Sequence, residues 1–275
     1  MDRINLNYQI KLNVNVITCL SFIDNMEFLV DLRIKHSKLE KLWDGNKSLR
    51  NLMWMNLSYS ENLQELASSI ENATNLQDLN LSRCSSLMEL LFSIGNATNL
   101  YKLILRGSSS LVKLPSLIGN TTNLQKLNLS GCSNQMELSY SIGNATNLQY
   151  LDLSGCSSLV ELPLSIGNAT YLQCLDLSEC SSLMELPSSI GNALNLLYLN
   201  LRGCSSLVKI SFYIGNVTNL QILDLSKCSS LVKLPSSFGN AMNLQNMNLK
   251  ECSNLVELTF FIGNATNLQN LDLNK

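Results

Sequence analysis

Residues 147–170 read NLQYLDLSGCSSLVELPLSIGNAT, a 24-residue unit that recurs along most of the chain. The leucine near the start of the unit returns every 24 residues, at Leu52, Leu76, Leu100, Leu124, Leu148, Leu172, Leu196, Leu220, Leu244 and Leu268. A degenerate unit opens earlier, at Leu29. A fixed period of this length is typical of a solenoid, because one such unit cannot bury its apolar side chains without stacking on its neighbours.

Two spacings inside the unit predict its local structure. Leu151 and Leu153 alternate with more polar residues, which is the period of a short strand with one buried face. Together with Leu148, Cys156 and Leu159 they spell LxxLxLxxCxxL, which closely matches the leucine-rich-repeat signature. We therefore predict an α/β solenoid, a leucine-rich-repeat horseshoe or arc. Its parallel β-sheet forms the inner face, and short helical or irregular segments form the outer face.

Proline and glycine mark the same period independently of the leucines. Proline occupies one position of four units, at Pro115, Pro163, Pro187 and Pro235. Eight of the thirteen glycines occupy a second position, from Gly95 to Gly263, each before an asparagine. Because proline presets φ and lacks a backbone donor, while glycine permits close or unusual backbone paths, both positions predict a turn that every unit repeats.

The repeats assign the domain organisation. We expect residues 27–275 to form one leucine-rich-repeat domain of about eleven 24-residue repeats, the last truncated. Residues 1–26 are interpreted as a degenerate N-terminal cap or the start of the first repeat. The first twenty residues interrupt their apolar side chains with Asn, Gln and Lys, unlike a secretion signal, and no apolar run is long enough to span a membrane. The chain is therefore expected to be cytoplasmic or nuclear, with no membrane partner.

Charge and cysteine usage narrow the class of partner. Nineteen basic and twenty-one acidic residues nearly balance, and the basic ones are scattered singly along the chain, which disfavours nucleic acid and favours a protein partner. Seven of the nine cysteines lie on the 24-residue grid, at Cys84, Cys132, Cys156, Cys180, Cys204, Cys228 and Cys252, and Ser60 and Ser108 fill its gaps. We predict a ladder of free thiols that meets backbone groups, with no metal and no cofactor.

Protein recognition in a solenoid is expected on the outward-pointing positions of the inner sheet. Most of these positions carry small polar residues, and large apolar, aromatic or arginine side chains are exceptions that favour binding hot spots. The candidates for protein binding are Trp54, Ile104, Arg106, Tyr150, Tyr198, Arg202 and Ile222. The competing interpretation is that isolated exposed apolar side chains are normal on any protein surface.

Several other residues are predicted to have structural rather than catalytic roles. A column of Asn and Asp, including Asp152 and Asp176, predicts hydrogen bonds between neighbouring strands rather than acid/base chemistry. NxT triplets such as the one at Asn144 are interpreted as turns, and they become glycosylation sites only in a secreted chain. Gln135 replaces an inward leucine and predicts a soft spot. His36, the single histidine, is expected at the surface of the first strand, without a catalytic partner.

The amino-acid sequence of the repeats also resembles that of a known family. The runs DLRIKHSKLEKLW (31–43) and NLMWMNLSYSENLQEL (51–66), with the repeated NATNLQxLxLSxCSSLVELPSSIG, resemble the repeats of plant intracellular immune receptors. These receptors carry a Toll/interleukin-receptor-like domain and a nucleotide-binding domain before the repeats. The resemblance implies that the repeats sense pathogen effectors or modified host proteins and contribute to autoinhibition, with the nucleotide-binding domain of the same receptor as a further candidate partner. Nucleotide binding is not implied, because residues 45–48 lack the upstream glycine of a phosphate loop.

Three alternatives remain open from the sequence. The repeats also suit the ligand-binding ectodomain of a cell-surface receptor, which the NxT triplets favour and the unpaired column cysteines oppose. A stand-alone repeat adaptor or decoy is the second alternative. The third alternative is an enzyme, but the sequence has no Ser/His/acid, Cys/His or metal-binding set around His36, its single histidine. We therefore expect a binding protein that is not an enzyme.

Overall fold

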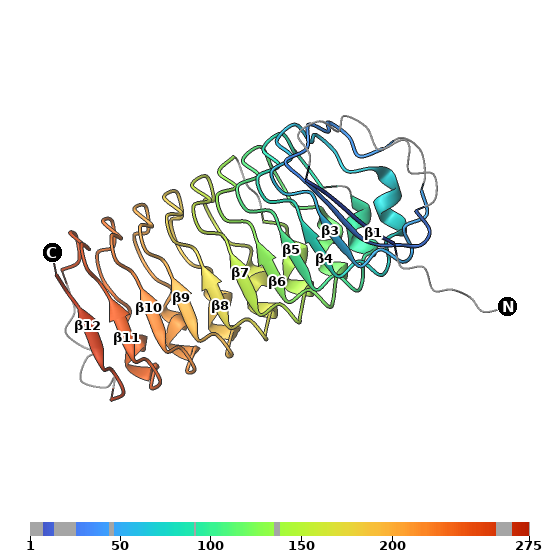
Figure 1. Ribbon diagram of the computed structural model, residues 1–275. Helices are drawn as coiled ribbons and strands as arrows, with labels where there is room; N and C mark the ends of the chain where they lie inside the picture. The colour runs from blue at the N-terminus through green and yellow to red at the C-terminus, as the bar shows by residue number, and fades with distance from the viewer. Residues whose placement is uncertain are drawn as a thin grey trace.

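The computed structural model describes residues 8–13, 26–43, 47–90, 92–134, 138–256 and 266–274. Within these ranges twelve parallel strands form a single sheet in chain order, stacked along one axis with the two termini at opposite ends (Figure 1). The strands are β1 (Tyr8–Asn13), β2 (Leu29–Lys35), β3 (Trp54–Asn56), β4 (Asp78–Asn80), β5 (Lys102–Ile104), β6 (Lys126–Asn128), β7 (Tyr150–Asp152), β8 (Cys174–Asp176), β9 (Tyr198–Asn200), β10 (Ile222–Asp224), β11 (Asn246–Asn248) and β12 (Asn270–Asp272). This arrangement confirms the predicted solenoid.

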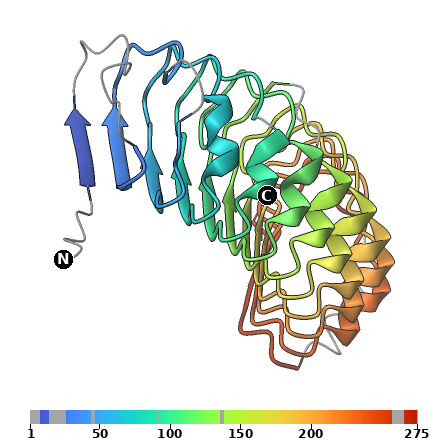
Figure 2. The same cartoon turned by 90° about the vertical axis from the view of Figure 1, so that its right-hand side faces the viewer.

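Short 3₁₀ helices run along the side opposite to the sheet, so the sheet lies on the inner side of an arc (Figure 2). They are η1 (Ser68–Asn72), η2 (Phe92–Asn96), η3 (Ser116–Asn120), η4 (Tyr140–Asn144), η5 (Leu164–Asn168), η6 (Ser188–Asn192), η7 (Phe212–Asn216) and η8 (Ser236–Asn240). None of the helices in the described ranges is long and apolar enough to cross a membrane.

The register of the sheet follows the sequence period. From β3 onward each strand pairs with the next residue for residue, so that Leu127, Leu151 and Leu175 lie in one row. Paired residues are 24 positions apart in the sequence from β3 onward, but Leu32 of β2 pairs with Met55 of β3, which is 23 positions later. The inward leucines of all turns merge into one continuous core. Each turn therefore derives its stability from both neighbours, as expected of a solenoid.

Proline and serine start the outer helices in two different ways. Pro163 precedes η5 with φ −65°, the value that its ring imposes. Ser139 and Ser211 take the same position before η4 and η7, and their hydroxyl oxygens accept hydrogen bonds from the backbone N–H groups of Ser141 and Tyr213. The proline column of the sequence thus marks a helix start, and serine replaces proline by capping.

The glycine column allows neighbouring turns to approach each other closely. A Cβ added at Gly191 would lie 2.6 Å from the carbonyl oxygen of Tyr213 in the next turn, and one at Gly167 would overlap the carbonyl oxygen of Ser189. No side chain fits at that separation. The glycines before asparagine are therefore required by packing between turns rather than by an unusual backbone angle.

Four further predictions concern Gln135, residues 1–26, the NxT triplet at Asn144, and His36. Gln135 lies outside the described residues, as does most of the 1–26 segment, although β1 falls within that segment and pairs with β2. Asn144 is exposed at the end of η4, which places that NxT triplet in the predicted turn. His36 is exposed, as predicted, but it directly follows β2, the second strand of the sheet.

Candidate protein-binding face

The inner face consists of four columns of residues that run across the strands. In β7 and the residues after it, Tyr150, Asp152 and Ser154 face outward while Leu151 and Leu153 are fully buried. A fourth column lies directly after the third, at the residue where the chain leaves the sheet. Side chains at equivalent positions of neighbouring turns lie about 5 Å apart, which is the spacing of paired strands. We call these four columns from β2 to β12 the inner face.

All seven candidate residues lie on the inner face, in separate groups. Trp54 on β3 and Ile222 on β10 are each 38% exposed, so part of each apolar side chain is accessible to a partner. Arg106 and Arg202 are exposed just after β5 and β9, whereas Ile104 is half-buried. The structure thus distributes the candidates over most of the arc instead of gathering them in one pocket.

One continuous row forms in the second half of the face. Tyr150, Cys174, Tyr198 and Ile222 are direct partners on the neighbouring strands β7 to β10. Burial, and then the Asp152 carboxylate, raise the pKa of the Tyr150 phenol to about 12. Burial likewise raises the pKa of Tyr198. Both phenols are therefore neutral at physiological pH and can donate a hydrogen bond to a partner.

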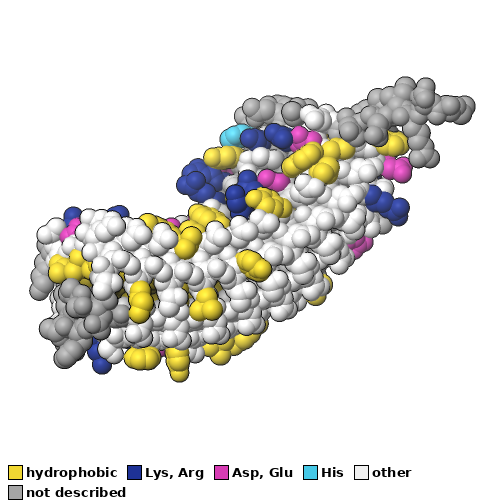
Figure 3. All heavy atoms as spheres, turned by 90° about the horizontal axis from the view of Figure 1, so that it is seen from below, with side chains coloured by type: hydrophobic (Ala, Val, Ile, Leu, Met, Phe, Trp, Pro, Cys, Tyr) yellow, Lys and Arg dark blue, Asp and Glu magenta, His cyan; other side chains and the backbone are white. Residues whose placement is uncertain are grey.

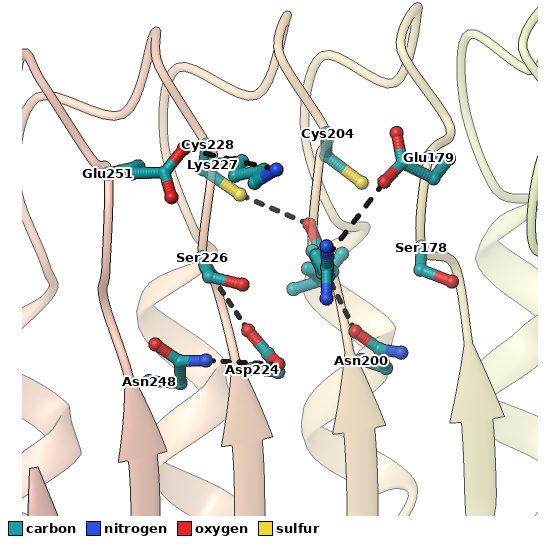
Figure 4. Close-up of polar contacts among 12 residues, drawn as sticks. Ser178, Glu179, Asn200, Cys204, Asp224, Ser226, Lys227, Cys228, Asn248 and Glu251 are labelled. Carbon is teal, nitrogen blue, oxygen red and sulfur yellow. Dashed lines mark hydrogen bonds and ion pairs between the residues drawn. The ribbon is translucent and has the colours of Figure 1, made fainter. Parts of the chain in front are cut away.

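The Asn and Asp column has the structural role that the sequence predicts. The Asn128 side-chain amide donates to Asp152 across neighbouring strands at 2.8 Å, and Asn248 donates to Asp224 at 3.3 Å (Figure 4). The second oxygen of each aspartate accepts the backbone N–H two residues later, as Asp152 does from Ser154 at 3.0 Å. These carboxylates close the ends of the strands, so they are not free acids for catalysis.

Sequence reasoning missed the fourth column. At this position the backbone is left-handed in every turn from β2 to β11, and four turns use glycine there, for example Gly107 with φ +70°. The other turns place larger residues in this costly conformation. They are His36, Tyr59, Arg83, Glu179, Lys227 and Glu251. The recurrence of glycine at Gly107, Gly131, Gly155 and Gly203 was the signal that could have identified the position.

The first three members of the fourth column form a stack at the rim of the face. The rings of His36 and Tyr59 lie 4.6 Å apart and nearly parallel, at 18°. The Arg83 guanidinium lies on the Tyr59 ring at 5.3 Å from its centroid, a cation–π geometry. A Cβ on Gly107 would be 3.2 Å from Cγ of Arg83, so glycine leaves room for the arginine stem.

Stacking also gathers charges that are scattered along the sequence. From β2 to β6 the inner face carries six basic residues and two acidic ones, Asp31 and Asp78. From β7 to β12 its described residues include six acidic and three basic ones. Asp31 accepts from Arg33 at 2.9 Å, and Asp78 lies 3.4 Å from Lys102. The first half of the face is therefore basic and the second half acidic.

A second recessed surface lies on the outer side. It is a groove across η4 to η7, and its apolar lining includes Tyr140, Leu164, Phe212 and Tyr213. Tyr140 is 66% exposed there. This groove is the natural competitor of the inner face for a binding partner.

The cysteine column is a structural ladder, as predicted. Each described member is buried and donates its thiol hydrogen to a carbonyl oxygen 27 residues earlier, as Cys180 does to Leu153 at 3.1 Å. Ser108 makes the equivalent bond to Leu81 at 2.9 Å. All cysteines within the described ranges are free, and those ranges contain no group of three or more His, Cys, Asp or Glu side chains placed to hold a metal ion.

Comparisons with family models and curated proteins agree with this architecture. Models described as Leucine Rich Repeat match residues 28–47, 123–145, 147–169, 171–193 and 219–241. The disease resistance protein TAO1 of Arabidopsis thaliana is 56% identical over 50 residues, and the probable disease resistance protein RPP1 of the same plant is 58% identical over 48. Each alignment covers 18% of this chain and 4% of the relative.

Solved structures support the fold. The leucine-rich repeat domain of the type III effector XopL superposes with a TM-score of 0.64 at 28% identity, covering 73% of this chain and 69% of that one. The functional domain of InlJ from Listeria monocytogenes, described as including a cysteine ladder, gives 0.56 at 20% identity over 94% of this chain and 59% of that one. The chain therefore has the leucine-rich-repeat fold, and its repeats are similar in sequence to segments of Arabidopsis disease resistance proteins.

Proposed function

We propose that residues 27–275 are the protein-binding recognition segment of a plant innate immune receptor. The segment binds a pathogen effector or a modified host protein on the inner face, and it contributes to holding the receptor inactive in the cytoplasm or nucleus. The observation that carries this proposal is the exposure of aromatic, aliphatic and arginine side chains on a face whose other positions are mostly small, polar or charged. The similarity of the repeats to disease resistance proteins supports the immune setting.

The chemistry of the face favours a polypeptide ligand. Trp54 and Ile222 offer apolar area, because each is 38% exposed. Arg106 and Arg202 offer charged donors, and aromatic and arginine side chains dominate the binding energy of protein interfaces. Tyr150 and Tyr198 each combine a ring with a neutral hydroxyl donor. The face contains no assembled catalytic group within the described residues, and we propose binding without catalysis.

The test compares matched tyrosine variants of the full chain. Binding partners are identified by proximity labelling in plant tissue, and their affinity is then measured with purified protein. Tyr198→Ala on the inner face is expected to weaken binding by about tenfold or more, as for a central aromatic contact. Tyr140→Ala on the outer side removes a similar exposed ring and is expected to change affinity less than about twofold. Loss of binding with Tyr140→Ala alone would refute the inner-face proposal and assign the outer groove.

The ectodomain of a cell-surface receptor is a second candidate function. The observation that favours it is the exposure of Asn144 and Asn168, the first residues of two NxT triplets. Enzymatic removal of N-linked sugars from the native protein decides between the two. A fall in mass would support the ectodomain, whereas an unchanged mass supports the intracellular proposal. The mass of the native protein separately distinguishes a segment of a larger receptor from a stand-alone adaptor or decoy.

A further inference from the structure

The two halves of the inner face differ in charge, and this difference constrains the ligand. In the first half, Arg83, Arg106 and Lys126 are exposed in successive turns and form no ion pair within the described parts of the chain. Lys126 lies 5.9 Å from the centroid of the Tyr101 ring, so its ammonium rests beside an exposed aromatic surface. Seen from below, Figure 3 shows Lys and Arg side chains gathered toward the N-terminal half, with hydrophobic side chains beside them.

The position of Arg83 indicates more than a solvated surface charge. Its backbone is left-handed, φ 58°, where the equivalent residues of the next three turns are glycine. Its guanidinium is held against one face of Tyr59, whose other face is covered by His36. A cation that is already ordered by stacking loses less conformational entropy when it binds an anion. The stack therefore presents a pre-oriented guanidinium at the rim of the basic half.

The second half of the face would repel an anionic ligand. Asp152 and Asp176 are direct neighbours on β7 and β8, and Glu179 follows close by. The Asp152 carboxylate accepts hydrogen bonds from Asn128 and Ser154 and has no hydrogen to donate, so it would repel a carboxylate of a ligand. A uniformly charged polyanion such as nucleic acid, bound along the arc, would therefore be attracted by the basic first half and repelled by the acidic second half. A ligand whose charge is confined to one end fits both halves.

We propose that the basic half of the inner face, from β2 to β6, binds an acidic segment of a partner protein. Carboxylates of the segment contact Arg83, Arg106 and Lys126, where guanidinium groups can bind them through paired hydrogen bonds. The uncharged or basic continuation of the segment lies along Tyr150, Tyr198 and the acidic half. This inference rests on the proposed protein-binding function and adds the charge and the direction of the bound segment.

The experiment uses a displayed library of random peptides, selected on the purified full chain. Selected peptides are expected to be rich in Asp and Glu at one end, and their affinity is expected to fall as salt rises. The double variant Arg83→Gln with Arg106→Gln should lower the affinity of the selected peptides by about tenfold or more. The matched double variant Lys113→Gln with Lys233→Gln removes the same charge from the outer side of the repeats and should change affinity less than about twofold. Circular dichroism checks that both variants fold.

The outcomes separate this inference from the proposed function. Peptides without acidic enrichment that still depend on Tyr198 would overturn the acidic-segment proposal and leave protein binding on the inner face intact. Peptides insensitive to every inner-face variant would overturn both. A single-stranded DNA oligonucleotide serves as a further probe. If it bound more tightly than the acidic peptides and lost affinity in the Arg83 and Arg106 variant, nucleic acid would replace the peptide as the ligand.

Discussion

The thiol of Cys156 donates its hydrogen to the carbonyl oxygen of Leu129, 27 residues earlier, at 3.2 Å. This bond links two consecutive turns at the place where the chain leaves the sheet. The same carbonyl also accepts the backbone N–H of Cys132 at 3.1 Å, so the thiol occupies its second acceptor position. A column that looks like a set of reactive cysteines is therefore a set of hydrogen-bond donors between turns.

Replacing Cys156 by Val should destabilise the chain, because valine fills the space of the thiol without donating to Leu129. The expected loss is about 0.5–1.5 kcal/mol, the net value of one hydrogen bond, because the Leu129 carbonyl keeps the backbone N–H of Cys132 as a partner. Cys156→Ser should be tolerated better, since Ser108 occupies the same column and donates to Leu81. Urea unfolding followed by circular dichroism measures both variants. Equal stability of the Val and Ser variants would contradict a donor role.

The same ladder predicts a loss of stability in alkaline solution. Burial raises the pKa of Cys84, Cys132, Cys180 and Cys228 from 9.0 to about 12. The folded state therefore keeps protons that the unfolded state releases above pH 9. The stability that the protonated thiols contribute should be fully present below pH 9. The free energy of unfolding should fall as pH rises from 9 toward 12, by up to about 1.4 kcal/mol per pH unit for each thiol.

Urea midpoints measured from pH 8 to pH 10.5 test this dependence. Cys180→Ser provides the control, because serine keeps a donor in the column but does not ionise in this range. Its stability should fall less steeply with pH than that of the native chain. An identical slope for the two proteins would show that the buried thiols do not cause the alkaline loss.

The left-handed column predicts opposite effects of glycine and alanine in neighbouring turns. Gly155 has φ +69°, so Gly155→Ala should destabilise the fold by about 1 kcal/mol. Glu179 holds φ +60°, and Glu179→Gly should be neutral or stabilising by about 0.5–1 kcal/mol, because its pair with Arg202 is long and exposed. Ser178→Gly, one residue earlier, is the control and should destabilise. Thermal unfolding would argue against this assignment if both glycine variants lost equal stability.

The Asn and Asp column predicts that a single added carboxylate is harmful. Asn128→Asp would face Asp152 at the site of the present 2.8 Å hydrogen bond and extend the neighbouring pair of Asp152 and Asp176 to three. The combined loss of the bond and the new repulsion should cost about 1–3 kcal/mol. Asn80→Asp is the control, because Asn80 makes the same bonds to Ser82 but its strand partners are Asn56 and Ile104, so the added carboxylate should cost less there. Chemical unfolding that ranks Asn80→Asp as the less stable variant would refute the repulsion.

The sequence alone was sufficient for the solenoid, the inner sheet and the core. Its strict 24-residue period places Leu151 and its equivalents in one row. The two-residue alternation within each strand determines which side chains face outward. The seven candidate residues lie on the predicted face for that reason. The role of the Cys156 column followed from its place at the strand end. These features depend on local periodicity, which a linear sequence displays directly.

Only the tertiary structure decided how the face is organised. Whether Arg83 stacks on Tyr59 depends on a left-handed backbone at the point where the chain leaves the sheet, and that angle has no hydrophobic period to reveal it. Arg83, Arg106 and Lys126 are about 20 residues apart in sequence, and they share a surface because stacked turns shorten that separation to the spacing between strands. Periodicity determines which way a residue points, whereas stacking determines which residues become its neighbours.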